Sequence, residues 1–217
     1  MKVAIIGISG KLGQYMTQHA LNLGYDVVGV CRPESVEKLA RFGDRITIIP
    51  GRTNNPDVVR QAVQDADGVL TVLAPWGVDD YASGTVRAVL EHAPRDARLI
   101  FSSGWHLSVD GKDRYGWKIH FLEKVVGPVV RALRLVDIQD QHRAGKLIFS
   151  SGRRWTLVRG SDLEEGESEG LPIWAERAHD PRLAANRTCR TDFALFMVKA
   201  LTDERLVQVA PAISAAA

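Results

Sequence analysis

The strongest constraint on this fold is the regular alternation of short apolar runs with longer amphipathic stretches across residues 2–103. The short runs are rich in branched residues and predict buried strands, whereas the stretches between them have helical spacing. Runs that are apolar on both faces are typical of parallel strands covered by helices on either side. The alternation therefore predicts an α/β fold with a doubly wound parallel sheet. The predicted strands are 2–7, 26–30, 46–51, 68–73 and 98–103, and the predicted helices are 11–24, 34–43, 57–66 and 81–93.

The regular alternation ends after Ser103. We expect a single domain, residues 1–217, in which about 160–190 form a small substrate-side lobe. A helix over 191–203 would have Thr191 as its N-cap. The other predicted elements are a loop at 104–117, a mostly helical stretch to about 151, a sixth strand at 154–160, an exposed loop rich in Glu and Gly at 162–170, an edge strand at 205–210 and a frayed tail, "PAISAAA".

The hexapeptide "LIFSSG" occurs twice, at 99–104 and at 147–152. The first copy follows a helix end and a proline, so we predict a strand. The second copy continues the helical spacing of "DIQDQHRAGK", so we predict a helix end capped by Gly152. Only Ser102 and Ser103 of the first copy therefore lie at the carboxyl edge of a strand, where open α/β sheets bind ligands.

A glycine motif, "GISGKLG", joins the first predicted strand to the first helix. Its glycines allow a tight turn, the approach of a pyrophosphate to the backbone and close helix packing. We therefore predict a dinucleotide-binding loop. Its cofactor-binding residues would be Gly7, Ser9, Gly10, Lys11, Leu12 and Gly13. An exposed first-turn lysine is the alternative for Lys11.

The end of the second strand indicates which cofactor is bound. An NAD enzyme places Asp or Glu there to bind the ribose hydroxyls. This chain has Cys31 followed by Arg32. A guanidinium suits a 2′-phosphate, so we expect NADPH; a solvated arginine is the alternative.

The spacing of this glycine motif, GxxGxxG, resembles that of short-chain dehydrogenases/reductases. With "VCR", "FSSG", "DQHRAGKLIFSSGRRWTLVRG" and "CRTDFA", nearly the whole chain resembles the atypical NmrA-like proteins and the biliverdin reductase B/flavin reductase group. The resemblance implies a Rossmann-type NAD(P)-binding fold. It also implies that "TVLAPWG" runs past the cofactor, although a core or lid position is the better interpretation of Trp76. Cofactor contacts are then expected at Leu73, Ala74, Pro75 and Ser102. Gly160 departs from the family, which often has proline after the sixth strand.

Catalysis is where the chain departs from ordinary short-chain enzymes, which use a tyrosine with a lysine four residues later. The lysine lowers the tyrosine pKa, so that the phenol can exchange a proton near neutral pH. Tyr115 is followed by Lys118, one residue short, within the predicted loop. The usual positions of the pair fall near Asp137 and Gln141. The standard pair is therefore absent.

In flavin-reductase-like members, hydride passes directly to a bound planar acceptor, and the protein mainly positions the two molecules. On this resemblance Ser103 matches the serine beside the nicotinamide, and His142 lies within one residue of a histidine near the acceptor. We take Ser103, Tyr115 and His142 as candidate catalytic residues. The alternatives are a strand-end cap for Ser103 and a surface position for His142, while His106 and His120 are interpreted as solvated.

Composition limits the partners. The net charge is +2, which gives no electrostatic case for nucleic acid. No apolar run reaches the roughly 18 residues of a membrane span. Cys31 and Cys189 have no metal-ligand spacing and fit a reducing cytosol.

We therefore expect a cytoplasmic NADPH-dependent oxidoreductase without a metal, either a monomer or a homodimer. Its small-molecule substrate would be aromatic or conjugated: a flavin, quinone, enone or carbonyl. The alternatives are a redox-sensing regulator that binds NADP(H) without turnover and a sugar epimerase or dehydratase.

Overall fold

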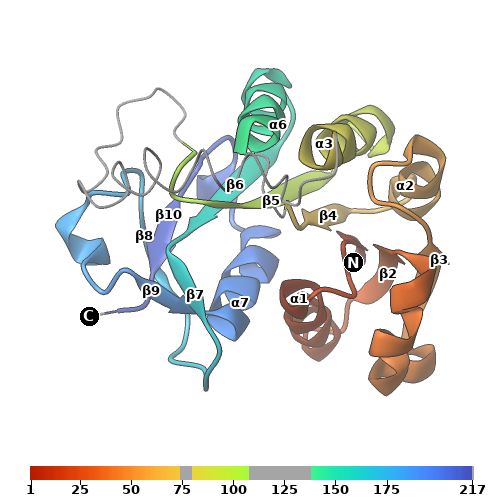
Figure 1. Ribbon diagram of the computed structural model, residues 1–217, viewed down its shortest axis with the longest axis horizontal. Coiled ribbons are helices and arrows are strands. Elements are labelled where there is room, and N and C mark those ends of the chain that lie inside the picture. Colours follow the sequence, from red (N-terminus) through yellow and green to blue (C-terminus); the bar gives the residue numbers. More distant parts are fainter. Residues whose placement is uncertain (74–79, 108–137, 217) are drawn as a thin grey trace, which may run out of the picture.

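The computed structural model describes residues 1–73, 80–107 and 138–216. Its main sheet has eight strands in the order β3-β2-β1-β4-β5-β6-β10-β8 (Figure 1). Neighbouring strands are parallel except β10 and β8, which pair antiparallel at one edge. The strands are β1 (Lys2–Ile6), β2 (Asp26–Cys31), β3 (Ile46–Pro50), β4 (Gly68–Thr71), β5 (Arg98–Gly104), β6 (Trp155–Gly160), β8 (Ile173–Ala175) and β10 (Ala212–Ser214). The predicted doubly wound α/β fold is confirmed.

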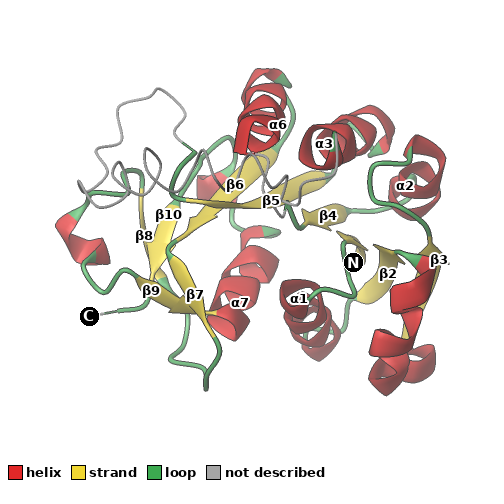
Figure 2. Ribbon diagram, viewed as in Figure 1, coloured by secondary structure: helices red, strands yellow, loops and turns green. Residues whose placement is uncertain are grey.

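Helices cover both faces of this sheet (Figure 2). One face carries α1 (Lys11–Asn22), α7 (Arg190–Ala200) and the 3₁₀ helix η1 (Pro33–Arg45); the other carries α2 (Pro56–Val63), α3 (Tyr81–His92) and α6 (Ile138–Ser150). Successive strand residues alternate between the two layers, so Ile5 enters one apolar core and Ile6 the other. This alternation between two buried faces explains why the strands are continuously apolar.

The two copies of "LIFSSG" adopt the predicted structures. The first forms β5 between β4 and β6, with Ser103 paired to Arg159. The second forms the end of α6, where the Ser151 hydroxyl donates to the Ile148 carbonyl at 2.7 Å. Gly152 follows with φ +63°, the left-handed conformation of a helix-ending glycine. The surrounding sequence therefore outweighs the local preferences of six identical residues.

The prediction of an edge strand at 205–210 is wrong. The Asp203 carboxylate accepts the Arg205 N–H at 3.0 Å and starts a 3₁₀ turn, η3 (Glu204–Leu206). The tail expected to fray instead contains β10, which pairs with β6 on one side and β8 on the other. Ala212 and Ile213 there are fully buried. The paired backbone stabilises this strand, and its small side chains gave no periodic signal.

Thr191 is not an N-cap. Helix α7 begins at Arg190, after the cap residue Cys189, and Thr191 lies in the first turn. There its carbonyl and hydroxyl oxygens lie 3.0 and 3.1 Å from Nε2 of His19 on α1. The contact between the two helices, rather than capping, accounts for this threonine.

The segment 162–170 is not a loop throughout. It opens with β7 (Asp162–Glu164), which pairs in parallel with β9 (Arg187–Cys189) in a separate two-stranded sheet. The short 3₁₀ helix η2 (Pro181–Leu183) lies between β8 and β9 in the sequence. The glycine at 160 also has a packing reason, because a Cβ there would lie 2.3 Å from the Phe193 ring.

Candidate cofactor-binding and catalytic site

The glycine loop lies where the order of the strands reverses, between β1 and β4. Ligands of open α/β sheets bind in the crevice at this point, outside the carboxyl ends of the strands. Gly7 leaves β1 with φ +93°, and its N–H donates to the Val30 carbonyl of β2 at 2.9 Å. A Cβ on Gly7 would lie 3.3 Å from Val72, just beyond β4. The loop is therefore held against the ends of both neighbouring strands.

Gly13 and Gly10 are glycines for different reasons. A Cβ on Gly13 would lie 2.4 Å from the Gly7 carbonyl oxygen and 2.6 Å from that of Ile8, so the close packing of turn and helix requires glycine. Gly10 has φ −69°, and among the described residues a Cβ there would meet only the Gly7 oxygen, at 3.5 Å. This part of the chain therefore leaves open space above Gly10.

The first turn of α1 also suits an anion. None of the described side chains caps this helix at Gly10, and its first turn contains no acidic residue. The N–H groups of a helix N-terminus need acceptors and carry partial positive charge. With the space above Gly10, they fit the pyrophosphate of a dinucleotide.

The end of β2 holds no anionic group for ribose. Cys31 is buried, and this burial raises the pKa of its thiol. Arg32 follows with a side chain that is 63% exposed, and its Nε lies 3.3 Å from the Glu34 carboxylate. Exposed ion pairs of this kind are weak. The guanidinium can therefore exchange Glu34 for a more highly charged phosphate.

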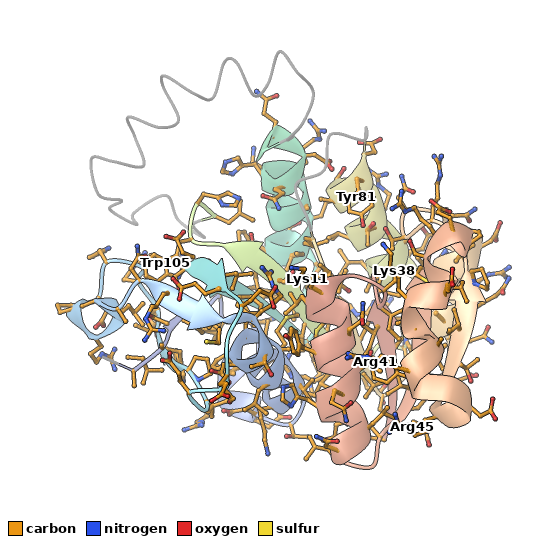
Figure 3. All side chains as sticks on the ribbon, turned by 60° about the horizontal axis from the view of Figure 1, so that its bottom comes forward. Lys11, Lys38, Arg41, Arg45, Tyr81 and Trp105 are labelled. Atoms are coloured by element: carbon orange, nitrogen blue, oxygen red, sulfur yellow. The ribbon has the colours of Figure 1, made fainter. Side chains whose placement is uncertain are left out.

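Lys11 has a partner that the sequence did not reveal. It stands exposed at the N-terminal end of α1 (Figure 3), and its Nζ lies 3.1 Å from Oε1 of Glu165. The same carboxylate accepts from Arg190 Nε at 2.8 Å and from the Tyr15 hydroxyl at 3.3 Å. The hydrogen bond from Arg190, followed by that from Lys11, lowers the pKa of Glu165. A carboxylate interpreted as part of an exposed loop thus lies beside the glycine loop.

A hydrogen-bonded chain crosses the carboxyl ends of β4 and β5. Ser102 Oγ accepts the Leu73 N–H at 3.1 Å, and the Leu73 carbonyl accepts from Gln141 Nε2 at 2.8 Å. Gln141 is 2% exposed, and its Oε1 lies 2.7 Å from Nε2 of His106. The sequence identified Gln141 only as the usual lysine position and treated His106 as solvated. The fold brings both to the predicted site.

Ser103, next to the last residue of β5, has a buried hydroxyl with no hydrogen-bond partner in the part of the chain that the structure describes. Such a group is costly unless a ligand completes it. His142 is exposed on α6, with its ring centroid 6.2 Å from that of His106. The other predicted site residues, namely Tyr115, Ala74 and Pro75, lie outside the described residues, as do Lys118, His120 and Trp76.

Asp140 fixes the position of α6, and no sequence pattern indicated this. Its buried carboxylate accepts the Ala82 N–H at 2.6 Å and the Ser83 N–H at 3.3 Å, and also the Ser83 hydroxyl. It therefore caps the N-terminus of α3 from a neighbouring helix. This anchor holds the adjacent Gln141 against the end of β4.

Comparison with known families identifies the group to which these features belong. A family model for NAD(P)H-binding proteins matches residues 7–204. The chain belongs to this NAD(P)H-binding family. The match confirms the expected family and its nicotinamide dinucleotide cofactor. No curated protein matches the sequence.

Several solved structures of NAD(P)H-binding and related proteins share the fold. A wide-type short-chain dehydrogenase/reductase from Veillonella parvula in complex with NADP has a TM-score of 0.70 at 18% identity, covering 98% of this chain and 94% of that one. ChuY, an anaerobillin reductase from Escherichia coli O157:H7, has a TM-score of 0.72 at 18% identity, covering 99% and 97%. The oxidoreductase ylbE from Lactococcus lactis has a TM-score of 0.71 at 13% identity, covering 100% and 93%.

Within residues 1–73, 80–107 and 138–216, no helix combines the length and apolar character needed to cross a bilayer. Nor do three or more His, Cys, Asp or Glu side chains gather there as a metal site.

Proposed function

We propose that this member of the NAD(P)H-binding family is an NADPH-dependent reductase. Its acceptor would be a small, aromatic or conjugated molecule: a flavin, quinone, enone or carbonyl. The observation that carries the proposal is the buried, unpartnered hydroxyl of Ser103 at the end of β5. It lies beside the hydrogen-bonded ends of β4 and β5, at the edge of the sheet where a nicotinamide would be placed.

The chain's own residues divide the work of binding. The N–H groups at the start of α1 would hold the pyrophosphate of the dinucleotide, and Arg32 would pair with its 2′-phosphate. Ser103 donates a hydrogen bond to the nicotinamide or the acceptor. When bound, NADPH supplies the hydride. The protein supplies orientation, which is a large share of the catalysis of such transfers.

Both cysteines are buried free thiols, which supports a reducing compartment such as the cytoplasm. The unpartnered Ser103 hydroxyl and the glycine loop at 7–13 both favour a small molecule as the substrate.

The test is NADPH consumption with a panel of flavins, quinones and ketones, in the wild type and in Ser103→Ala. Loss of a hydrogen bond to the reacting groups predicts that kcat falls roughly 10- to 100-fold, or about 1.4–2.7 kcal/mol, while NADPH affinity changes much less. Ser151→Ala is the matched control, because the same hexapeptide there ends a helix and its hydroxyl bonds only locally.

Equal losses in Ser103→Ala and Ser151→Ala would contradict the role of Ser103. Tight NADPH binding without turnover of any acceptor would instead favour a redox-sensing regulator, which needs the cofactor site but no hydride transfer.

A further inference from the structure

We propose that His106 is the proton donor of this reductase and that Gln141 is its positioning residue. This inference rests on the proposed function. It identifies which group supplies the proton in a chain whose usual tyrosine and lysine positions fall near Asp137 and Gln141. The juxtaposition that carries it is the hydrogen-bonded sequence from Leu73 through Gln141 to His106.

The Leu73 carbonyl determines which nitrogen of the neutral His106 ring carries the hydrogen. A carbonyl oxygen can only accept a hydrogen bond, so the Gln141 amide must turn its NH₂ group toward Leu73. The amide oxygen of Gln141 therefore faces His106 Nε2 at 2.7 Å, and Nε2 must carry a hydrogen. The other nitrogen, Nδ1, is then the one that gains and loses a proton.

Nδ1 is also the nitrogen that lies nearest the end of β5. A Cβ placed on Gly104 would lie 2.7 Å from Nδ1 and 2.9 Å from Cε1 of His106, so this edge of the ring lies over Gly104. Gly104 directly follows Ser103 in β5. The absence of a side chain at position 104 therefore leaves room for the imidazole beside the carboxyl end of β5, one residue along the chain from Ser103.

Two titratable residues flank Gln141 in the sequence, Asp140 and His142. Asp140 accepts hydrogen bonds from the N-terminus of α3 and forms an ion pair with Arg143. The His142 ring lies edge-on to the His106 ring, at 6.2 Å between centroids. The amide oxygen of Gln141 is neutral and can accept the Nε2 hydrogen of His106 in either protonation state of the ring.

The chemical step balances. NADPH loses a hydride and becomes NADP⁺, and the hydride forms a new bond to the electrophilic atom of the acceptor. The electron pair of the acceptor's double bond moves to the oxygen or nitrogen at its far end. That atom takes the proton from Nδ1 of His106. The ring is left neutral with Nε2–H still donated to Gln141, and it recovers its proton from water.

The first experiment measures turnover with whichever acceptor of the panel the wild type reduces, for example menadione or FMN. His106→Gln should lower kcat about 100-fold, the lower range for loss of a general acid, with NADPH Kd changed less than about threefold. The fall of kcat as pH rises through the imidazole pKa should vanish in this variant. Added imidazole should restore part of the activity of His106→Ala. His92→Gln, on the last residue of α3, should behave as wild type.

The second experiment tests positioning without turnover. Nitrogen-15 NMR of the free protein should show neutral His106 protonated at Nε2, and Gln141→Leu should lose this preference while kcat falls about tenfold. Gln139→Leu, on the exposed side of α6, is the control. Gly104→Ala should displace the ring and lower kcat without reducing NADPH affinity.

Three results would overturn the inference: wild-type kcat in His106→Gln, an NADPH affinity that falls as much as kcat, or a neutral ring protonated at Nδ1. Any of these, with the wild type still reducing its acceptor, would refute the role of His106 alone. Failure of the wild type to reduce any acceptor would refute the reductase proposal itself.

Discussion

Two alanine substitutions in one glycine loop should separate the requirements of the fold from those of the cofactor. At Gly13 an added methyl group would lie 2.4–2.7 Å from backbone atoms of Gly7 and Ile8, which cannot move aside cheaply. Overpacking of this kind costs about 1–3 kcal/mol. At roughly 2–4 °C per kcal/mol for a chain of this size, Gly13→Ala should lower Tm by about 2–12 °C.

Gly10→Ala should do the reverse. Its φ of −69° suits alanine, and within 1–73, 80–107 and 138–216 the added methyl group meets only the Gly7 oxygen, at 3.5 Å. Replacing a glycine N-cap by alanine should cost well under about 1 kcal/mol. The methyl group would, however, occupy the space proposed for the pyrophosphate. Loss of one charge-assisted hydrogen bond, about 1.5–3 kcal/mol, weakens NADPH binding roughly 10- to 150-fold.

For both variants, thermal melts measure the loss of stability and calorimetry measures the Kd for NADPH. A wild-type NADPH Kd in Gly10→Ala would refute the placement of the pyrophosphate. A wild-type Tm in Gly13→Ala, or an equally large loss of Tm in Gly10→Ala, would refute the distinction between the two glycines.

Three further outcomes follow from contacts of the site. Arg32→Ala should weaken NADPH binding tenfold or more, because a charge–phosphate contact contributes about 1–3 kcal/mol, and should leave NADH binding unchanged. Glu34→Gln, the control, should not weaken NADPH binding. Equal losses of affinity for both cofactors in Arg32→Ala would exclude the 2′-phosphate role. The pKa of Glu165 is lowered from its ordinary 4.5, so its stabilising contacts are complete above that pH and are lost as pH falls through the lowered pKa. In thermal melts at decreasing pH, the Tm of Glu165→Gln should therefore fall less steeply than that of the wild type. Identical falls in Tm would count against the contact. Asp140→Ala should lower the free energy of unfolding by about 1–3 kcal/mol, because the N-terminal N–H groups of α3 lose their acceptor. Urea unfolding measures this loss. An unchanged urea midpoint would show that other groups satisfy these N–H groups.

Much of the fold could be predicted because its signals are local. A strand buried on two faces must be apolar along its length, and a helix buried on one face must repeat its apolar residues every three or four positions. Both patterns can be seen without knowing the neighbours of the segment. The glycine loop is local as well, because its turn and its helix start share the seven residues 7–13. The same holds for the two copies of "LIFSSG", whose flanking residues predicted a strand and a helix end.

The errors lie where a partner from elsewhere in the chain decides the structure. Thr191 is a residue type that often caps helices, but its hydroxyl lies within hydrogen-bond distance of His19 on another helix. The apolar pattern at 205–210 was overruled by the turn that starts at Asp203. The segment Ala212–Ser214, which has no apolar period, forms β10 because its backbone pairs with β6 on one side and β8 on the other.

The site divides in the same way. The sequence alone indicated the family, the glycine loop and the two serines near the carboxyl end of β5, because each is a contiguous motif that can be recognised without knowing distant residues. Only the tertiary structure brought Glu165 to Lys11, Asp140 to the start of α3, and His106 through Gln141 to Leu73. The hydrogen bond from Gln141 to Leu73 joins residues 68 positions apart. A hydrogen bond requires atoms within about 3 Å, whatever their separation along the chain. Contacts of this kind have no sequence period, so they are decided only when the sheet and its two helical layers assemble.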